Sequence, residues 1–169
     1  MRPHNLMRLA RGALHAAKAA LLVPLLIFFA GSATAQTQTP GSASAVGYVK
    51  TVTGEAWVSS AGQRVKAVPG TPILLGSQLK TLSGASMGIA FKDNTLMSFG
   101  SDTELTVDEF LYAPAQGQLR LDTRLVKGSL NYVSGVIAKL KPDAVSIKTP
   151  SGIIGVRGTQ FVAKVEDVQ

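Results

Sequence analysis

The sequence from Thr149 to Phe161 reads Thr-Pro-Ser-Gly-Ile-Ile-Gly-Val-Arg-Gly-Thr-Gln-Phe, which combines strand-forming residues with one proline and three glycines. Because proline cannot donate to a β ladder, Pro150 is expected at a strand end or edge, and we assign it no chemistry. Glycine inside an apolar strand pattern usually marks a bulge, a close backbone approach or a positive φ, and Gly152, Gly155 and Gly158 are interpreted in this way. The stretch predicts a final pair of strands, residues 144–149 and 153–165.

The rest of the sequence after residue 45 consists of short segments in which apolar and polar residues alternate. Turn residues separate these segments at intervals of about ten residues, which is typical of an all-β domain. The clearest alternation, in residues 118–126, predicts one buried face with Leu119, Leu121, Thr123 and Leu125 and one mostly wet face. A turn is expected at Lys127-Gly128-Ser129, a hairpin over residues 86–99 and one helical turn within residues 134–141. The remaining expected strands are residues 46–53, 55–59, 63–68, 78–82, 103–107 and 130–133.

The N-terminus is typical of a secretory signal. Four basic residues (Arg2, Arg8, Arg11 and Lys18) precede an apolar run at residues 19–30 and the small-x-small pattern Ala33-Thr34-Ala35. An uncleaved anchor is the alternative, but the apolar core is about a dozen residues long, against the roughly 20 that span hydrocarbon. We therefore predict a Sec-type signal peptide at residues 1–35, a flexible leader at 36–45 and a β domain at 46–169, in a periplasmic or secreted protein without a stable membrane anchor after cleavage.

The composition excludes several classes of chemistry. Both histidines, His4 and His15, lie in the predicted signal peptide, and the chain has no cysteine. The mature protein would thus lack the Ser-His and Cys-His nucleophile systems and the usual zinc or copper ligands. Asp108 and Glu109 are adjacent, so on a regular strand their carboxylates would point to opposite faces. We predict no catalytic residue, no cofactor, no metal site and no enzymatic activity.

The net charge also bears on the partners. Of the 17 Lys and Arg residues, four lie in the predicted signal peptide, so that 13 oppose 10 acidic residues in the mature chain. This mild excess is spread over separate strands and argues against a nucleic-acid surface, which needs clustered basic residues.

Four segments in order, residues 76–81, 86–99, 121–128 and 149–161, resemble successive elements of the FecR-like domain family. The best-known members of that family are periplasmic parts of inner-membrane sigma-factor regulators that sense iron-siderophore uptake. The resemblance implies an all-β fold of short antiparallel strands in a solenoid-like or sandwich-like domain. Only 18 residues precede the apolar run, so we expect a stand-alone exported FecR-like domain without the cytoplasmic anti-sigma segment or the further C-terminal domain of those regulators.

The resemblance also marks a set of signature residues, for which we favour a structural role. Arg157 is interpreted as a buried or half-buried side chain that locks one β layer to the next, and contact with an anion or a partner is the alternative. The signature residues are Thr149, Pro150, Gly155, Val156, Arg157, Gly158, Thr159 and Phe161.

Three aromatic residues with polar groups, Trp57, Tyr112 and Tyr132, are candidate ligand contacts that would form a platform for a sugar ring or a peptide. Packing at the edge of the core is the favoured alternative for each. The sequence therefore predicts a non-enzymatic envelope binding or interaction module, accessory to signalling or regulation. The alternative is a carbohydrate-binding or peptidoglycan-binding protein. The expected partner is an envelope protein or a cell-surface polysaccharide, and an exposed C-terminal edge strand at residues 161–165 would permit homo-oligomers.

Overall fold

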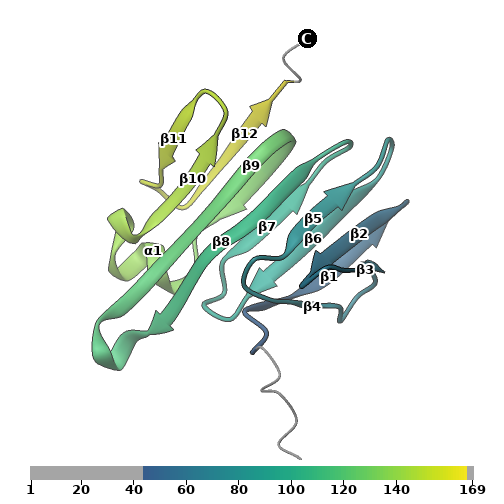
Figure 1. Cartoon of the computed structure of the whole chain (residues 1–169). Helices are drawn as coiled ribbons and strands as arrows, with labels where there is room; N and C mark the ends of the chain where they lie inside the picture. The colour runs from purple at the N-terminus through teal and green to yellow at the C-terminus, as the bar shows by residue number, and fades with distance from the viewer. Residues whose placement is uncertain (1–43, 167–169) are drawn as a thin grey trace, which may run out of the picture. The chain divides into compact units, whose positions relative to one another are not determined.

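The computed structural model describes residues 44–166, and these form an all-β domain of mostly antiparallel strands, which confirms the predicted fold class (Figure 1). The predicted signal peptide and most of the predicted leader lie outside the described residues, as do the last three residues of the predicted β domain. The strands are β1 (Gly47–Thr53), β2 (Ala56–Ser60), β3 (Gln63–Lys66), β4 (Pro72–Ile73), β5 (Gln78–Thr81), β6 (Ser86–Phe91), β7 (Leu96–Phe99), β8 (Glu104–Ala113), β9 (Gln118–Val133), β10 (Val145–Thr149), β11 (Gly152–Gly155) and β12 (Gln160–Val165). A short helix, α1 (Val136–Leu140), and 3-10 turns at Pro114–Gln116 and Pro142–Ala144 complete the domain.

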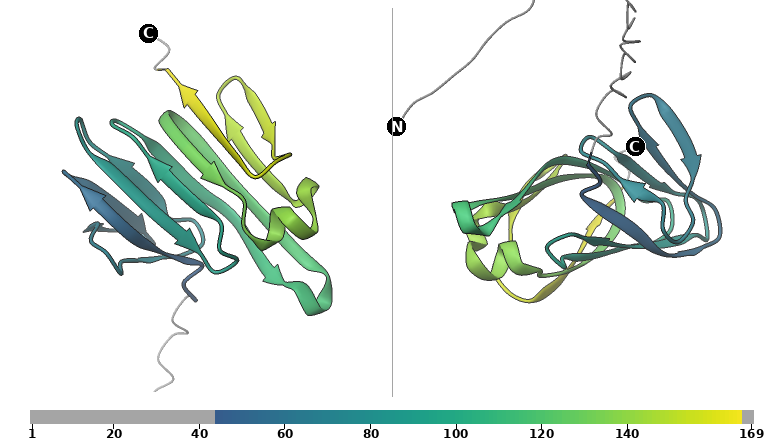
Figure 2. Two further views of the ribbon diagram at one scale, coloured as in Figure 1. Left: turned by 180° about the vertical axis from the view of Figure 1, so that it is seen from behind. Right: turned by 90° about the horizontal axis from the view of Figure 1, so that it is seen from below.

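The strands form one curled, half-barrel sheet with two arms that share β9 (Figure 2). The first arm has the order β4-β1-β6-β7-β9-β12, and the second arm has the order β3-β2-β5-β8-β9-β10-β11. Strands that follow one another in sequence cross between the arms at a common corner, β1 into β2, β5 into β6 and β7 into β8. At this corner each of these pairs of strands is interrupted by a break in the chain's strand structure, whereas β9 bends there as one continuous strand.

The bend in β9 lies at Gly128. The strand pairs with β8 up to Lys127 and with β7 from Leu130. Gly128 takes a φ of 88°, and a Cβ at this position would lie 2.7 Å from the Cβ of Thr103. The Ser129 N–H donates to the Thr103 hydroxyl at 3.0 Å. The predicted turn at Lys127-Gly128-Ser129 is therefore wrong, because the glycine bends a continuous strand whose two halves both have neighbours.

Apolar side chains from both arms fill the space between them as one core. Phe91 of β6 stacks on Phe110 of β8, with ring centroids 5.5 Å apart, and so connects the first arm to the second. Leu121 and Leu125 of β9 are completely buried, which confirms the buried face predicted for residues 118–126.

One buried carboxylate fixes helix α1 to the β6–β7 turn. Asp93 is completely buried, and its Oδ2 accepts hydrogen bonds from the Thr95 hydroxyl at 2.7 Å and from the Ile137 N–H at 3.2 Å. A Cβ at Gly135 would lie 2.5 Å from the Asp93 carbonyl oxygen, so the helix approaches the turn closely only because residue 135 is glycine. The predicted hairpin over residues 86–99 and the helical turn within residues 134–141 are confirmed.

The predicted strand at residues 153–165 is wrong as a single element. β11 ends at Gly155 and β12 begins at Gln160, and the segment between them crosses from the second arm to the first. Gly158 takes a φ of 129°, and its carbonyl accepts a hydrogen bond from the Ser134 hydroxyl at 2.6 Å. The chain leaves the strand here because Ser134, which is distant in sequence, binds the backbone of the crossing segment.

Candidate interaction surface

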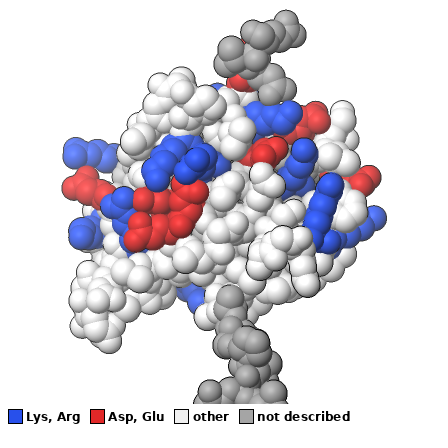
Figure 3. Space-filling model, in the orientation of Figure 1, with Lys and Arg blue, Asp and Glu red and all other residues white. Residues whose placement is uncertain are grey.

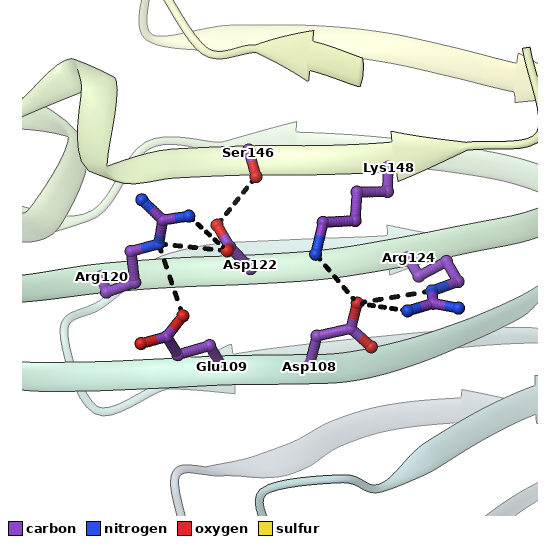
Figure 4. Close-up of polar contacts among 7 residues, drawn as sticks. All are labelled: Asp108, Glu109, Arg120, Asp122, Arg124, Ser146 and Lys148. Atoms are coloured by element: carbon purple, nitrogen blue, oxygen red, sulfur yellow. Dashed lines mark hydrogen bonds and ion pairs between the residues drawn. The ribbon is translucent and has the colours of Figure 1, made fainter. Parts of the chain in front are cut away.

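The outer face of the second arm carries acidic and basic side chains side by side (Figure 3). Asp108 of β8, Arg124 of β9 and Lys148 of β10 meet on this face from three neighbouring strands (Figure 4). The Asp108 Oδ2 accepts a hydrogen bond from the Arg124 Nη2 at 3.0 Å and lies 3.5 Å from the Lys148 Nζ. One carboxylate oxygen is thus shared by two cations.

A second group on the same face centres on Asp122, whose side chain is almost completely buried. Asp122 accepts hydrogen bonds from the Arg120 Nη2 at 2.6 Å and from the Ser146 hydroxyl at 2.7 Å. Arg120 also lies 3.5 Å from Glu109, and hydrogen bonding to Asp122 together with the charge of Asp122 raises the pKa of Arg120 above its ordinary value. These ion pairs and hydrogen bonds link side chains of β8, β9 and β10, and exposed pairs of this kind contribute little to stability.

The two adjacent carboxylates of β8 do not point to opposite faces, contrary to the expectation for a regular strand. The register between β8 and β9 shifts between Val107 and Glu109. A β-bulge places consecutive residues on the same side of the sheet. Asp108 therefore reaches Arg124 while Glu109 reaches Arg120 on one face.

An open groove of about 820 Å³ lies beside the turn between β10 and β11. Arg124 and Lys148 line one part of the groove, and Val126, Pro150 and Ile153 line another. Ile153 is 70% exposed. The groove therefore combines positive charge with an uncovered apolar wall.

The signature residues gather at this end of the domain, and most of them are exposed. Pro150 lies in the turn between Thr149 and Gly152, at a strand end as predicted. Val156 is buried, Phe161 is half-buried and stacks on Tyr132 with centroids 5.0 Å apart, and Thr149 is half-buried. The exposed members are Pro150, Gly155, Arg157, Gly158 and Thr159.

Among the signature residues, Arg157 differs most from the position that the sequence predicted. Its side chain is 87% exposed, and its Nη2 lies 3.8 Å from Asp143, whose side chain is also exposed. The expectation of a buried or half-buried arginine is wrong, because Arg157 lies in the exposed part of the segment that crosses between the arms. An exposed ion pair of this length contributes almost nothing to stability.

The signature glycines also differ from one another. Gly158 has the expected positive φ. Gly152 and Gly155 have no positive φ, and a methyl group added at either position would meet no atom within 4 Å, so neither of these structural reasons for glycine applies to them.

The three candidate aromatic contacts do not form a common platform. Tyr132 is completely buried, so its assignment as a ligand contact is wrong, because its strand position points into the core. Trp57 is half-buried under Arg64, whose guanidinium carbon lies 4.3 Å from the ring centroid. Tyr112 is half-buried beside Phe110.

Trp57 and Tyr112 are also far apart. Trp57 pairs with Lys80, which pairs with Glu104 at the start of β8, and Tyr112 lies near the end of that strand. Eight strand residues span roughly 26 Å. A single sugar ring cannot contact both side chains.

Sequence reasoning missed the group of Asp108, Arg124 and Lys148. The alternating charges of residues 118–126 by themselves indicate only a wet face. The group requires β10 to lie parallel to β9, with Lys148 opposite Arg124. No local pattern indicates that pairing.

Two further observations concern residues 44–166. No helix in this range is both long and apolar enough to cross a membrane. No three His, Cys, Asp or Glu side chains in the same range come together as a metal-binding group.

The comparison with known families is informative. The sequence profile described as FecR protein matches residues 77–169, which is more than half of the chain and includes β5 to β12. No curated protein and no solved structure matches the chain. The charged face, the groove and the exposed signature segment all lie within the matched residues, and the chain belongs to the FecR protein family, a family of regulatory proteins.

Proposed function

We propose that this FecR protein is an exported, non-enzymatic interaction module of the bacterial envelope, accessory to signalling or regulation. Membership of a regulatory family supports the association with signalling. The basic N-terminus, the apolar run at residues 19–30 and the Ala33-Thr34-Ala35 pattern support export to the periplasm or the medium through cleavage after residue 35. The partner in this proposal is an envelope protein.

The observation that carries the proposal is the position of the signature segment on the surface, next to uncovered sheet edges. Among the described strands, β11 pairs only with β10, and β12 pairs only with β9. β11 has no charged residue, and Val162 of β12 is 72% exposed. The exposed side chains of this segment, Arg157 and Thr159, are available for contact with a partner.

The edges at the other end of the sheet differ in a way that supports this view. β3 has the sequence Gln-Arg-Val-Lys, with all four residues exposed, and β4 is a two-residue strand that begins with Pro72. Charged side chains, proline and short length are the usual protections of an edge against pairing with another chain. Since β11 and β12 lack most of these protections, we propose the C-terminal edges as the binding side, with a second copy of the chain as one possible occupant of β12.

A carbohydrate-binding function has no comparable support. It depends on Trp57, Tyr112 and Tyr132 as stacking residues, but Tyr132 is buried and the other two are far apart. We therefore retain protein interaction as the proposal.

Site-specific photo-crosslinking in cells tests the proposed function. A photoreactive amino acid replaces Ile153 or Val162, and Val65 on the charged edge strand β3 serves as the matched control because it is also exposed. We expect one recurrent protein adduct from positions 153 and 162 and none from position 65. An adduct of twice the mass of the chain from position 162 would identify a second copy.

Fractionation of the same cells provides the check on export. Mass spectrometry of the tagged protein in the periplasm or medium is expected to find an N-terminus at Gln36. Absence of any protein adduct, with the tagged chain retained in the polysaccharide fraction, would contradict the proposal.

A further inference from the structure

We propose that the groove beside the β10–β11 turn binds an extended segment of a partner protein, one that carries a carboxylate and, two residues away, an apolar side chain. This inference rests on the proposed function, because it names the chemistry of the partner and the place where it binds. It follows from three features of the groove.

The first feature is an excess of positive charge. Arg124 and Lys148 share a single carboxylate oxygen of Asp108, so the three side chains together carry a net charge of +1. Among the described residues, Arg124 donates to Asp108 through its Nε and Nη2, and its side chain is 56% exposed. The Lys148 side chain is 40% exposed, so both cations can contact a second carboxylate. Charge-assisted hydrogen bonds of this kind are among the strongest that a protein makes.

The second feature is an apolar wall that begins two residues along β9 from the charged Arg124. Val126 follows Arg124 on the same outer face of β9, since side chains alternate along a strand, and both line the groove. Two residues along a strand span roughly 6.6 Å. Ile153 on β11 also lines the groove. An extended ligand with an acid at one position and an apolar residue two positions further therefore matches both parts.

The third feature is a gap in the sheet. β10 pairs with β9 up to Arg124, and β12 pairs with β9 from Gly128. Neither of these two strands pairs with Val126. A peptide in the groove can lie along this section of β9, where main-chain hydrogen bonds provide affinity and side chains provide selectivity.

The charge of the groove decides between acidic and basic segments. A basic segment would place a third cation beside Arg124 and Lys148, which is unfavourable at short range. The groove is therefore expected to select acidic segments, and the attraction is expected to weaken as salt is added.

The test is a titration followed by backbone-amide NMR, with protein purified from cells that express the full chain. The probe is the capped peptide Thr-Glu-Thr-Ile-Thr. Two matched peptides are Thr-Lys-Thr-Ile-Thr, which reverses the charge, and Thr-Glu-Thr-Ser-Thr, which removes the apolar side chain. We expect saturable shifts at Arg124, Val126 and the non-proline residues of 148–153 with the first peptide, and at least tenfold weaker binding of the other two.

Variants of the protein test whether the peptide binds in the groove. Arg124→Gln and Ile153→Ser are each expected to weaken binding of the first peptide about tenfold. Arg64→Gln and Val65→Ser, on β3 at the other end of the second arm, are the matched controls and are expected to leave the dissociation constant unchanged. The amide spectrum of each variant also reports whether it is folded.

Three results would overturn the inference: equal binding of the lysine peptide, shifts that are absent or not confined to the groove, or shifts at the same residues that depend on protein concentration without any peptide. The last would assign the groove to a second copy of the chain. If crosslinking captures a partner but the titration fails, only the groove inference is lost. If local shifts occur but no partner is captured in cells, the proposed function fails instead.

Discussion

Tyr132 places a hydroxyl in the core without a hydrogen-bond partner among the described residues. Thr95 donates to Asp93 and Ser134 donates to the carbonyl of Gly158, so neither neighbouring hydroxyl donates to the Tyr132 oxygen. Removing an unpaired buried polar group is neutral or favourable. Tyr132→Phe is therefore expected to leave the free energy of unfolding unchanged or to raise it by about 1 kcal/mol in urea denaturation. Tyr132→Ala, which removes the ring that stacks on Phe161, is expected to cost about 3–5 kcal/mol.

The same residue predicts a dependence of stability on pH. Burial raises the pKa of Tyr132 above its ordinary value near 10 and outweighs the opposite effect of the nearby Ser134 and Thr95 hydroxyls, while the charge of Asp93 acts in the same direction as burial. Between the unfolded and the folded pKa, the unfolded chain binds fewer protons, so stability falls as pH rises above about 10. Tyr132→Phe is expected to reduce this loss in urea titrations between about pH 8 and 11. Identical pH profiles of the two proteins would contradict the assignment.

For single residues, the sequence shows which side chains are aromatic or charged, but it does not show which face of the sheet each side chain occupies. Trp57, Tyr112 and Tyr132 look alike as amphipathic aromatics, but Tyr132 is completely buried, Tyr112 is half-buried against the core and Trp57 lies under Arg64. Asp108 and Glu109 share one face because of a bulge that no local residue pattern marks. Arg157 is exposed because of where its segment crosses the sheet. In each case the outcome depends on strand register, which is set by partners distant in sequence.

At the level of elements, the bend of β9 depends on a glycine that is in close contact with a neighbour. Gly128 and Gly117 both have positive φ, at 88° and 68°, but a Cβ would collide with Thr103 only at Gly128 and would meet nothing within 4 Å at Gly117. Gly117→Ala is expected to cost about 1–2 kcal/mol through backbone strain alone. Gly128→Ala is expected to cost about 1–3 kcal/mol more, because the methyl group also overpacks the corner. Urea denaturation measures both, and equal losses would show that the contact with Thr103 is unimportant.

The strands themselves were largely predictable, while the corners were not. Alternation identified the strand at residues 118–126 and the hairpin over residues 86–99, because one face of each is buried against a single core. A glycine that bends a strand and a glycine that ends one have the same local signal, so the sequence alone predicts a turn at Gly128. The break between β11 and β12 depends on Ser134, which is too distant in sequence to affect a local pattern.

At the scale of the whole molecule, the two arms are expected to unfold together. They share β9, and their buried side chains form one cluster without a boundary between the arms. The chain has no cysteine, so no disulfide separates one part from another or stabilises either part. For a domain of this size, a shared core and a shared strand favour a two-state transition.

Two independent probes test this cooperativity. Trp57, the single tryptophan, lies on β2 of the second arm, and its fluorescence reports that region, while far-UV circular dichroism reports all the strands. We expect the two urea transitions of the wild-type protein to superimpose. Gly128→Ala changes the corner of β9, which β5 and β8 separate from the Trp57 strand β2, and is expected to lower both midpoints by the same amount. If the circular dichroism midpoint fell while the Trp57 midpoint stayed in place, the arms would be separate folding units, and β9 would join them without coupling them.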